Sequence, residues 1–463
     1  MNQDRMQAGR ADRLVVLTAG CGMFLSSLDT GIVNIALPTW VRTFHSSIAT
    51  MTWTITLYTL ALVGTVMIFG RLGDRYGRVT VYGAGLLVFL AASALCGLSG
   101  SPGTLIAFRA LQGIGAAMLQ GTATAIITTA IPKERQGPAF GLLAVLLGLG
   151  PVLGPGIGGL ILSAGSWRWL FWINIPVAAA GLWGCSCLRK SVNGPKNAVP
   201  MNLPGHLLLS ASVLSLLQGL AMASRSGMLS TATWGPLVLF AVLFALFVCR
   251  EMRTSRPIVD LKLFLRIGFT APVLGIFVLG GATSLGFILP PYFLEQARHL
   301  DSWQAGLVNL SGPLGLVLVA RSSGRLMERA GTVRPMMAGL VAMAAAYGAL
   351  GTMQADWQPW GMAALLGLYG IGAGLFLPSN TAAMMSAAGR DIQGTMGAIQ
   401  RMVQNLGIAC YTAIAAAIIT AHSRSGIDTF VGGLREAWLF AAATIVLSLT
   451  VFVVASRRRR PEG

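Results

Sequence analysis

Hydrophobic residues run through this chain in long blocks that short polar breaks separate. Each block is close to the ~20 residues that an α-helix needs to cross the ~30 Å hydrocarbon core of a bilayer. The blocks lie at 14–38, 51–70, 79–98, 104–130, 138–163, 169–188, 204–222, 234–250, 269–293, 303–320, 335–353, 360–386, 396–420 and 436–455. This pattern predicts an all-α integral membrane protein with fourteen transmembrane helices.

The composition agrees with a membrane protein. Of the 463 residues, 54% are hydrophobic and only 10% are charged, and the mean hydropathy is +0.70. These values lie well outside the range of an ordinary soluble domain. The first apolar block is longer than the core of a signal peptide and has no small-residue cleavage site, so we expect it to remain as the first span.

The basic residues predict the orientation. An even number of spans puts both termini on one side, and 25 of the 33 Lys and Arg lie in the termini and loops of that side. Because cytoplasmic loops are enriched in Lys and Arg, we expect both termini in the cytoplasm and the protein in the cell (inner or plasma) membrane. The net charge of +18 then belongs to loops that face anionic lipid, and nucleic-acid binding loses its main support.

The sequence offers no motif for a metal or a nucleotide. Its four His and six Cys are dispersed, without the spacing of zinc or redox sites. It contains no Gly-Lys pair and therefore no phosphate loop of the G-x4-G-K-S/T type. We expect no cofactor, and this chain alone is not expected to use ATP.

Two parts of the chain repeat. GRLGDRYGR (Gly70–Arg78), between spans 2 and 3, returns as GRLMERAGT (Gly324–Thr332) between spans 10 and 11, and LQGIGAAMLQGTATA in span 4 returns as LYGIGAGLFLPSNTA in span 12. A shift of eight helices predicts two six-helix bundles in parallel repeat, residues 1–190 and 263–463, with a linker and two inserted helices in 191–262. We expect a central cavity at the interface of the bundles.

Two ionisable side chains lie deep in the first bundle. Asp29 interrupts the apolar stretch FLSSLDTGIVNIALP of span 1, and Arg109 lies in span 4. Each costs roughly 3 kcal/mol or more at mid-bilayer unless it faces a cavity or a partner, so we expect a shared polar site. Desolvation favours a neutral carboxyl group and a nearby Arg favours a charged one, so relative movement would couple a proton to a conformational change. The alternative is structural, with a hydrogen-bonded carboxylate and an arginine that ties helices together.

The second bundle offers two further candidates. Glu295 lies at the outer end of span 9. It is either a solvated acid at the end of a helix or, across the cavity from Asp29, a site that attracts a cation or carries a second proton. Arg401 lies in span 13 on a polar face, with a role in gating or substrate binding as the functional alternative. Aromatic residues such as Tyr58 and Trp172 either line the cavity for a lipophilic cation or belong to interfacial belts.

The loop between spans 2 and 3 combines glycines, which permit a tight turn, with charged residues that can cluster at the helix ends. Its candidate gating residues are Gly70, Arg71, Asp74, Arg75, Gly77 and Arg78. The alternative is that these basic residues only follow the general enrichment of Lys and Arg in cytoplasmic loops. Because the repeat replaces Asp74 by Glu328 in a matched frame, we expect Asp74 and Arg75 to form a conformational latch.

These motifs resemble those of the major facilitator superfamily, in particular its fourteen-span drug/proton antiporters. GRLGDRYGR is similar to the loop 2–3 signature, with Val79 where another basic residue is common, and LIAFRALQGIGAA is similar to the span 4 signature around Arg109. LDTGIVNIALP is similar to the span 1 motif, with Gly31 at a Thr position. Span 5 fits the antiporter motif at Gly141, Gly150, Gly154, Pro155, Gly158 and Gly159. The resemblance implies the major facilitator fold.

The glycines of span 5 let helix backbones touch, and Pro155 is expected to kink this helix. We expect span 5 to meet a partner from the other half and to seal the cavity against ion leak. Plain packing is the alternative.

The resemblance implies a proton-coupled antiporter that exports drugs or other lipophilic or cationic small molecules by alternating access. We expect a monomer in the lipid bilayer that is not an enzyme. A dedicated exporter of an endogenous metabolite or siderophore is the alternative. An intramembrane enzyme would need clustered His, Asp or Glu, which the sequence lacks.

Overall fold

The computed structural model describes residues 2–192, 202–226, 230–254, 257–258, 260–387, 392–422 and 427–457. Every regular element in these ranges is a helix, as the apolar blocks predicted. The chain divides into two compact units, unit 1 (Met1–His206 with Ala388–Arg401) and unit 2 (Leu207–Ala387 with Met402–Gly463). The predicted boundaries at residues 190 and 262 stay predictions.

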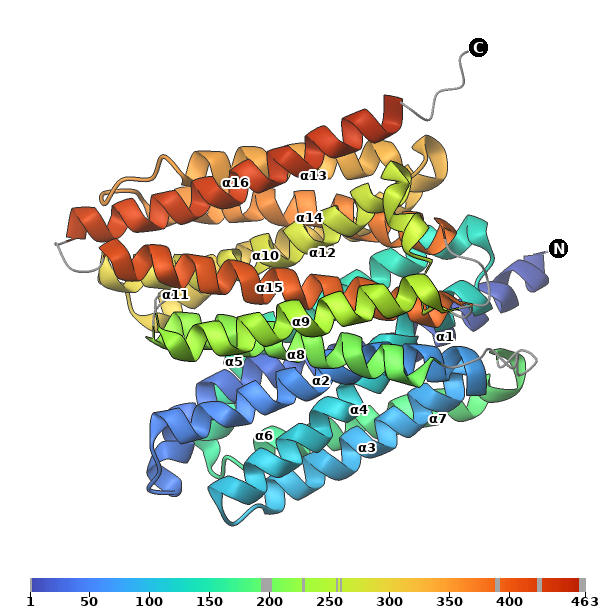
Figure 1. Ribbon diagram of the computed structural model, residues 1–463, viewed down its shortest axis with the longest axis horizontal. Coiled ribbons are helices and arrows are strands. Elements are labelled where there is room, and N and C mark those ends of the chain that lie inside the picture. Colours follow the sequence, from blue (N-terminus) through green and yellow to red (C-terminus); the bar gives the residue numbers. More distant parts are fainter. Residues whose placement is uncertain are drawn as a thin grey trace. The chain divides into compact units, whose positions relative to one another are not determined.

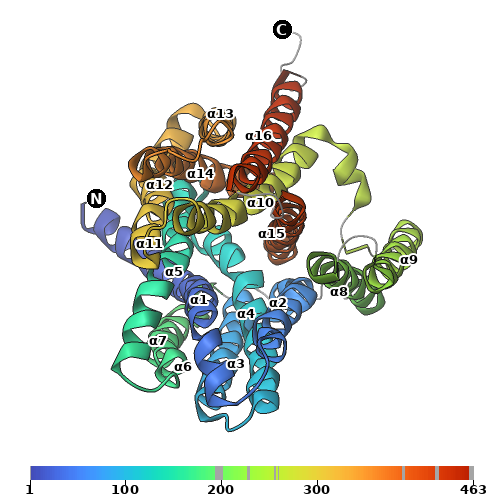
Figure 2. The ribbon, with the colours of Figure 1, turned by 90° about the vertical axis from the view of Figure 1, so that its left-hand side faces the viewer.

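Unit 1 is a bundle of long helices (Figure 1). It consists of α1 (Asn2–Thr43), α2 (Ile48–Tyr76), α3 (Arg78–Leu98), α4 (Pro102–Ala130), the 3-10 turn Lys133–Arg135, α5 (Gln136–Ala164), the short α6 (Trp169–Trp172), α7 (Asn174–Val192) and the first residues of α8 and α15. In the end-on view, α4 lies beside α2 and α3, and α1 lies beside α5 (Figure 2).

Local sequence signals set the helix ends around the site. Ser101 caps α4 in a capping box with Thr104, and Pro102 follows at the first helical position. Gly77 makes the sharp turn between α2 and α3 at φ 102°, a conformation that side chains disfavour. After these two turns α4 packs against both α2 and α3.

Unit 2 holds the remaining helices. They are α8 (Leu203–Ser226) from Leu207 onward, α9 (Thr231–Arg253), the 3-10 helix Leu261–Leu265, α10 (Ile267–Gln296), α11 (Ser302–Asn309), α12 (Ser311–Ala330), α13 (Val333–Leu350), α14 (Pro359–Ala387), most of α15 (Gln393–His422) and α16 (Ile427–Arg457). The predicted inserted pair, α8 and α9, lies side by side (Figure 2), with Gly219 against Leu237.

Twelve helices in the described ranges are long and apolar enough to cross a membrane. The other two predicted spans, 138–163 and 303–320, overlap the shorter apolar stretches Gln136–Gly150 and Trp303–Val319. Span 10 is divided into α11 and α12, whereas α5 is a single helix. The side chain of Pro155 lies outside the described part, so the expected kink stays a prediction.

Candidate functional site

The structure brings Asp29 of α1 and Arg109 of α4 together inside unit 1. Nη1 of Arg109 lies 2.5 Å from Oδ2 of Asp29, and each side chain is only 1% exposed. The two residues are 80 positions apart in the chain. They share one buried polar site, in which each charge offsets the desolvation of the other.

Gln112, one turn after Arg109 on α4, contacts both members of this pair. Its Oε1 accepts a hydrogen bond from Arg109 Nη1 at 2.7 Å, and its Nε2 donates to Oδ1 of Asp29 at 2.9 Å. The same Nε2 donates to Oγ of Ser93 at 2.8 Å. Nδ2 of Asn174 approaches the Ser93 hydroxyl at 3.5 Å. The network therefore joins α1, α3, α4 and α7.

The guanidinium of Arg109 has further partners. Its Nε donates to the carbonyl oxygen of Thr54 at 3.2 Å. Its central carbon lies 4.2 Å from the ring centre of Tyr58 and 6.0 Å from that of Phe171, so two aromatic faces meet the cation. Tyr58, a candidate for lining a drug cavity, packs instead against this internal cation.

An apolar cluster covers the ion pair. Trp40 stacks on Phe171, with ring centres 5.8 Å apart, and meets Trp167 edge to face at 6.0 Å. The cluster also contains Leu28 and Ile32, which flank Asp29 on α1. This layer excludes water, and the low local dielectric strengthens the hydrogen bonds beneath it.

Two glycines of α5 pack directly on the segment of α1 that carries Asp29. A Cβ added to Gly150 would lie 2.5 Å from the backbone N of Leu28, and one added to Gly154 would lie 2.8 Å from Cα of Gly31. The two backbones meet because neither glycine has a side chain. Gly31, the departure from the span 1 motif, lies in this contact.

The other positions of the glycine motif are less confined. A Cβ at Gly158 would make an ordinary 3.6 Å contact with Ile32, one at Gly159 would meet no atom within 4 Å, and Gly141 is buried. We expected span 5 to meet a partner from the other half. The close glycine contact that the structure describes is with α1 of the same unit, because the four-residue spacing of Gly150 and Gly154 presents both to that helix. The partner from the other half stays a prediction.

A second buried carboxylate, Asp74 of α2, binds the first turn of α15. Oδ1 accepts from the backbone N–H of Gly394 at 2.8 Å, and Oδ2 accepts from the N–H and the hydroxyl of Thr395 at 2.9 and 3.1 Å. First-turn N–H groups lack partners within their helix, and the helix dipole favours an anion there. Arg78 donates to the same carboxylate through Nε at 3.1 Å and Nη2 at 2.9 Å. Asp74 and these partners are called the Asp74 clasp below.

The other candidate gating residues lie in different environments. Gly70 lies against α15, where an added Cβ would come within 2.6 Å of Cβ of Ala398. Arg71 is buried. Arg75, expected to share the latch with Asp74, lies with its guanidinium 5.3 Å from the ring centre of Tyr76. The contacts with α15 that the structure describes come from Asp74 and Gly70, and a part for Arg75 in the latch stays a prediction.

The two candidates from the second half, Glu295 and Arg401, lie in α10 and α15. Glu295 is exposed, one residue before the end of α10 in unit 2. Arg401 is buried in α15, at the end of the stretch that belongs to unit 1. The hydrogen bonds described for Asp29 and Arg109 involve neither residue.

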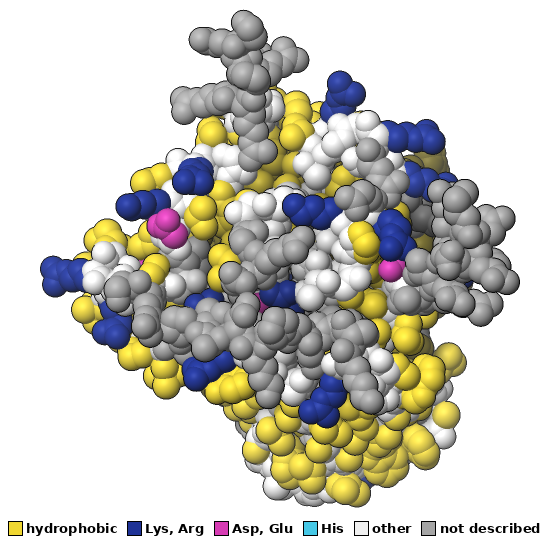
Figure 3. Space-filling model, turned by 90° about the vertical axis from the view of Figure 1, so that its right-hand side faces the viewer, with side chains coloured by type: hydrophobic (Ala, Val, Ile, Leu, Met, Phe, Trp, Pro, Cys, Tyr) yellow, Lys and Arg dark blue, Asp and Glu magenta, His cyan; other side chains and the backbone are white. Residues whose placement is uncertain are grey.

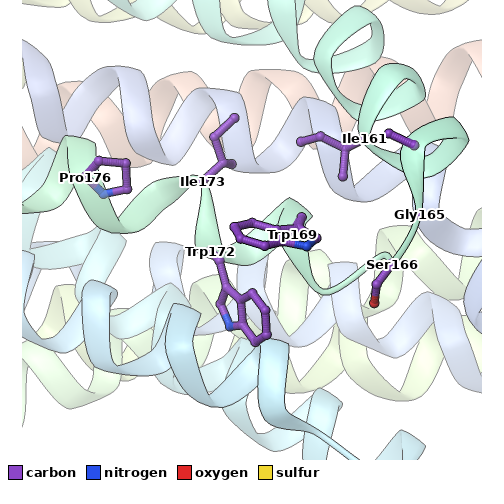
Figure 4. A pocket seen from close by; sticks show the side chains of 8 residues that line it. Ile161, Gly165, Ser166, Trp169, Trp172, Ile173 and Pro176 are labelled. Atoms are coloured by element: carbon purple, nitrogen blue, oxygen red, sulfur yellow. The ribbon is translucent and has the colours of Figure 1, made fainter.

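An apolar surface pocket of about 530 Å³ opens where α5, α6 and α7 meet (Figure 4). Trp169 and Trp172 line it, with ring centres 5.2 Å apart. Trp172 also packs on α3, where a Cβ at Gly97 would lie 2.7 Å from its Cδ1. The pocket lining includes the aromatic candidate Trp172 but none of the ionisable, gating-loop or antiporter-motif candidates.

Sequence reasoning missed the uncharged members of the network, Gln112, Ser93 and Asn174. A signal for Gln112 was present, because it follows Arg109 by three residues and so shares its helix face. Polar residues within apolar spans also favour interhelical hydrogen bonds. Nothing in the sequence indicated that Ser93 and Asn174 would join the network through Gln112.

The model of the Major Facilitator Superfamily matches residues 19–409 and 273–463. The chain belongs to this superfamily. The family expected from the motifs is therefore confirmed, and with it a multi-pass membrane protein with the major facilitator fold.

Relatives within the superfamily include drug-resistance proteins. The chain is 32% identical to the methylenomycin A resistance protein of Streptomyces coelicolor, over 88% of this chain and 85% of the relative. It is 30% identical to the riboflavin transporter RibZ of Clostridioides difficile, over 95% and 97%. It is 28% identical to the multidrug transporter protein MdtP of Bacillus subtilis, over 90% and 77%.

A solved structure supports the fold. The human organic anion transporter MFSD10 (TETRAN) aligns with a TM-score of 0.67 at 15% identity, covering 96% of this chain and 99% of that one.

Proposed function

We propose that this superfamily member is a proton-coupled antiporter that exports drugs or other lipophilic small molecules by alternating access. The observation that carries the proposal is the buried ion pair of Asp29 and Arg109, 2.5 Å apart and 1% exposed. Relatives named for methylenomycin resistance and multidrug transport support export of foreign compounds. The protein would work as a monomer.

The ion pair supplies a physical route to coupling. A proton on Asp29 removes the charge that compensates Arg109, and an uncompensated buried charge costs about 3–5 kcal/mol. Protonation thus favours a second conformation in which the two groups separate, and by linkage that conformation binds the proton more tightly. One carboxylate is sufficient for this exchange.

The Asp74 clasp would mark one state of the cycle. Its carboxylate binds the start of α15 through three hydrogen bonds of 2.8–3.1 Å. We propose that the clasp holds in one state and opens in the other, so that gating and proton binding use different carboxylates.

The proposed location is the cell membrane, with both termini in the cytoplasm. The uneven distribution of Lys and Arg along the sequence supports this orientation. Lys and Arg side chains are scattered over the face in Figure 3, where those of Asp and Glu are few, as suits a surface near anionic headgroups.

Export of one endogenous metabolite is the second candidate. The relative named as a riboflavin transporter aligns over almost the full length of both chains. A narrow substrate range is therefore a specific alternative, and riboflavin is a reasonable first compound to test.

The experiment is transport in inverted vesicles energised by a pH gradient, with lipophilic cations, neutral antibiotics and riboflavin as test compounds. We expect uptake of several lipophilic compounds that stops when nigericin collapses the gradient. Uptake of riboflavin alone would favour the metabolite exporter. Transport that persists without the gradient would contradict proton coupling.

A further inference from the structure

We infer that the surface pocket between α5, α6 and α7 binds one phospholipid, with an acyl chain in the pocket and the phosphate at Arg168. The pocket has a volume of about 530 Å³ and lies in unit 1. A volume of this size is typical of pockets that hold small organic molecules. The inference goes beyond the proposed transport and does not depend on proton coupling.

The lining of the pocket suits a hydrocarbon chain. Trp169, Trp172 and Ile173 form much of its surface, and no lining residue in the described part of the chain carries a charge. Ser166 and Pro176 lie at opposite ends of the group in Figure 4, with Trp169 between them. An elongated apolar surface with few directional polar groups binds its ligand mainly by van der Waals contact.

The pocket lies at the end of a membrane span. The apolar span Trp169–Arg189 begins with a residue that lines the pocket. The side chains nearby on α5, α6 and α7 are apolar and exposed, with values of 73% for Leu160, 58% for Trp169 and 66% for Trp183. Exposed apolar side chains of this size indicate a surface that contacts lipid, and Trp residues favour the depth of the headgroups.

The charge beside the pocket identifies the class of lipid. Arg168 is the only Lys, Arg, Asp or Glu between residues 136 and 188. It lies between Ser166 and Trp169, which both line the pocket. Its guanidinium carbon is 4.8 Å from the ring centre of the buried Trp167, a contact that holds the cation near the pocket.

A single cation next to an apolar pocket matches a phospholipid, because this molecule joins an anionic phosphate to hydrocarbon chains. Arginine binds phosphate through charge-assisted hydrogen bonds. The same cation repels the lipophilic cations that the proposed transport would carry, so the pocket does not suit them. A phospholipid therefore fits both the lining and the charge.

The bound lipid would also stabilise unit 1. Ile161 and Ile173 line the pocket and pack against the apolar cluster that contains Trp167 and Phe171. A ligand that binds the folded protein and not the unfolded chain raises the stability by mass action. We therefore expect the phospholipid to raise the melting temperature.

The test is native mass spectrometry of the delipidated full-length protein in a non-ionic detergent, titrated with phosphatidylglycerol. We expect one phospholipid to bind more tightly than any further ones. Ala164→Trp places an indole in the pocket and should abolish this tight binding. Ala180→Trp is the matched control, because it adds the same side chain at an exposed position of α7 outside the lining.

Arg168→Gln tests the phosphate contact separately. We expect about threefold to fivefold weaker binding, as for a partly exposed ion pair. Arg435→Gln, at an exposed position of α16 in unit 2, should leave the affinity unchanged. An affinity in Arg168→Gln equal to that of the wild type would contradict the contact between Arg168 and the phosphate.

Two results would overturn the whole inference. One is tight phospholipid binding that persists in Ala164→Trp or that Ala180→Trp weakens equally. The other is displacement of the phospholipid by a lipophilic cation, which would make the pocket a site for transported compounds. Because the binding is measured without transport, a protein that no pH gradient drives would reject the proposed function and leave the lipid site intact.

Discussion

Asp29 and Asp74 are both buried carboxylates with an arginine partner, yet their surroundings differ. Asp29 is bound by side chains alone, Arg109 and Gln112, in the interior of unit 1. Asp74 accepts two hydrogen bonds from backbone N–H groups and one from the Thr395 hydroxyl at the start of α15, and two more from Arg78. The first carboxylate is bound within a network of side chains, and the second is bound in part by a helix end.

This difference suits the two sites to different functions. Side-chain partners can separate without unfolding any helix, so the Asp29 network suits a group that exchanges a proton. A helix N-terminus keeps its partial charge at every pH, so the Asp74 clasp suits a contact that opens and closes mechanically. Changes at each site should therefore affect different observables.

Removal of the arginines should give the largest contrast. Arg109→Ala leaves Asp29 buried without its charge partner, and we expect a loss of about 3–5 kcal/mol in stability. Arg78→Ala leaves Asp74 bound to α15, and we expect a loss of about 1 kcal/mol. Thermal unfolding in detergent measures both. Equal losses would remove the distinction between the two sites.

Asp74→Asn tests the clasp directly. The amide keeps the shape of the side chain and loses the charge that the first turn of α15 attracts, so we expect roughly tenfold slower transport, equivalent to about 1.4 kcal/mol. Arg75→Gln is the control, because Arg75 lies over Tyr76 rather than at the clasp. The measurement is the initial rate of transport. A rate for Asp74→Asn equal to that of the wild type would show that the clasp plays no part in the transport cycle.

The glycines of α5 allow a paired test of close packing. A methyl group at Gly150 meets the backbone of α1, whereas one at Gly159 meets nothing within 4 Å. We expect Gly150→Ala to cost about 1–3 kcal/mol and Gly159→Ala to stay within about 0.5 kcal/mol of the wild type. Melting temperatures compare the two. The account of the α1–α5 contact fails if Gly159→Ala is the more damaging change.

Glu295→Gln should have the smallest effect. The side chain is exposed near the end of α10, and substitutions at such positions usually change stability by less than about 0.5 kcal/mol. We expect gradient-driven transport within about twofold of the wild type, a difference below roughly 0.5 kcal/mol. A complete loss of coupling would move the proton site from Asp29 to Glu295.

Charge and hydropathy were sufficient to predict much of this molecule. The apolar blocks predicted an all-helical membrane protein because burial of twenty apolar residues leaves few alternatives. Asp29 and Arg109 were predicted to share a site because each is costly in a membrane without the other. Strong energetic terms of this kind are visible in the sequence alone.

The smaller energetic contributions could not be predicted from the sequence. A neutral polar residue such as Gln112 or Ser93 costs little free energy in a membrane helix compared with a charged one, so nothing in the sequence required these residues to join the network around Asp29. The spacing of Gly150 and Gly154 predicted a face for close packing but not which helix would occupy it. The break between α6 and α7 at Ile173 could not be predicted, because a single non-helical residue scarcely changes the hydropathy of a span.

The central claim is that Asp29 carries the coupled proton, and Asp29→Asn tests it most directly. In vesicles, this variant should fold and insert, should lose transport driven by a pH gradient, and should retain exchange of substrate down its own gradient. Loss of both activities would indicate a structural role. Undiminished gradient-driven transport by Asp29→Asn would contradict the claim outright.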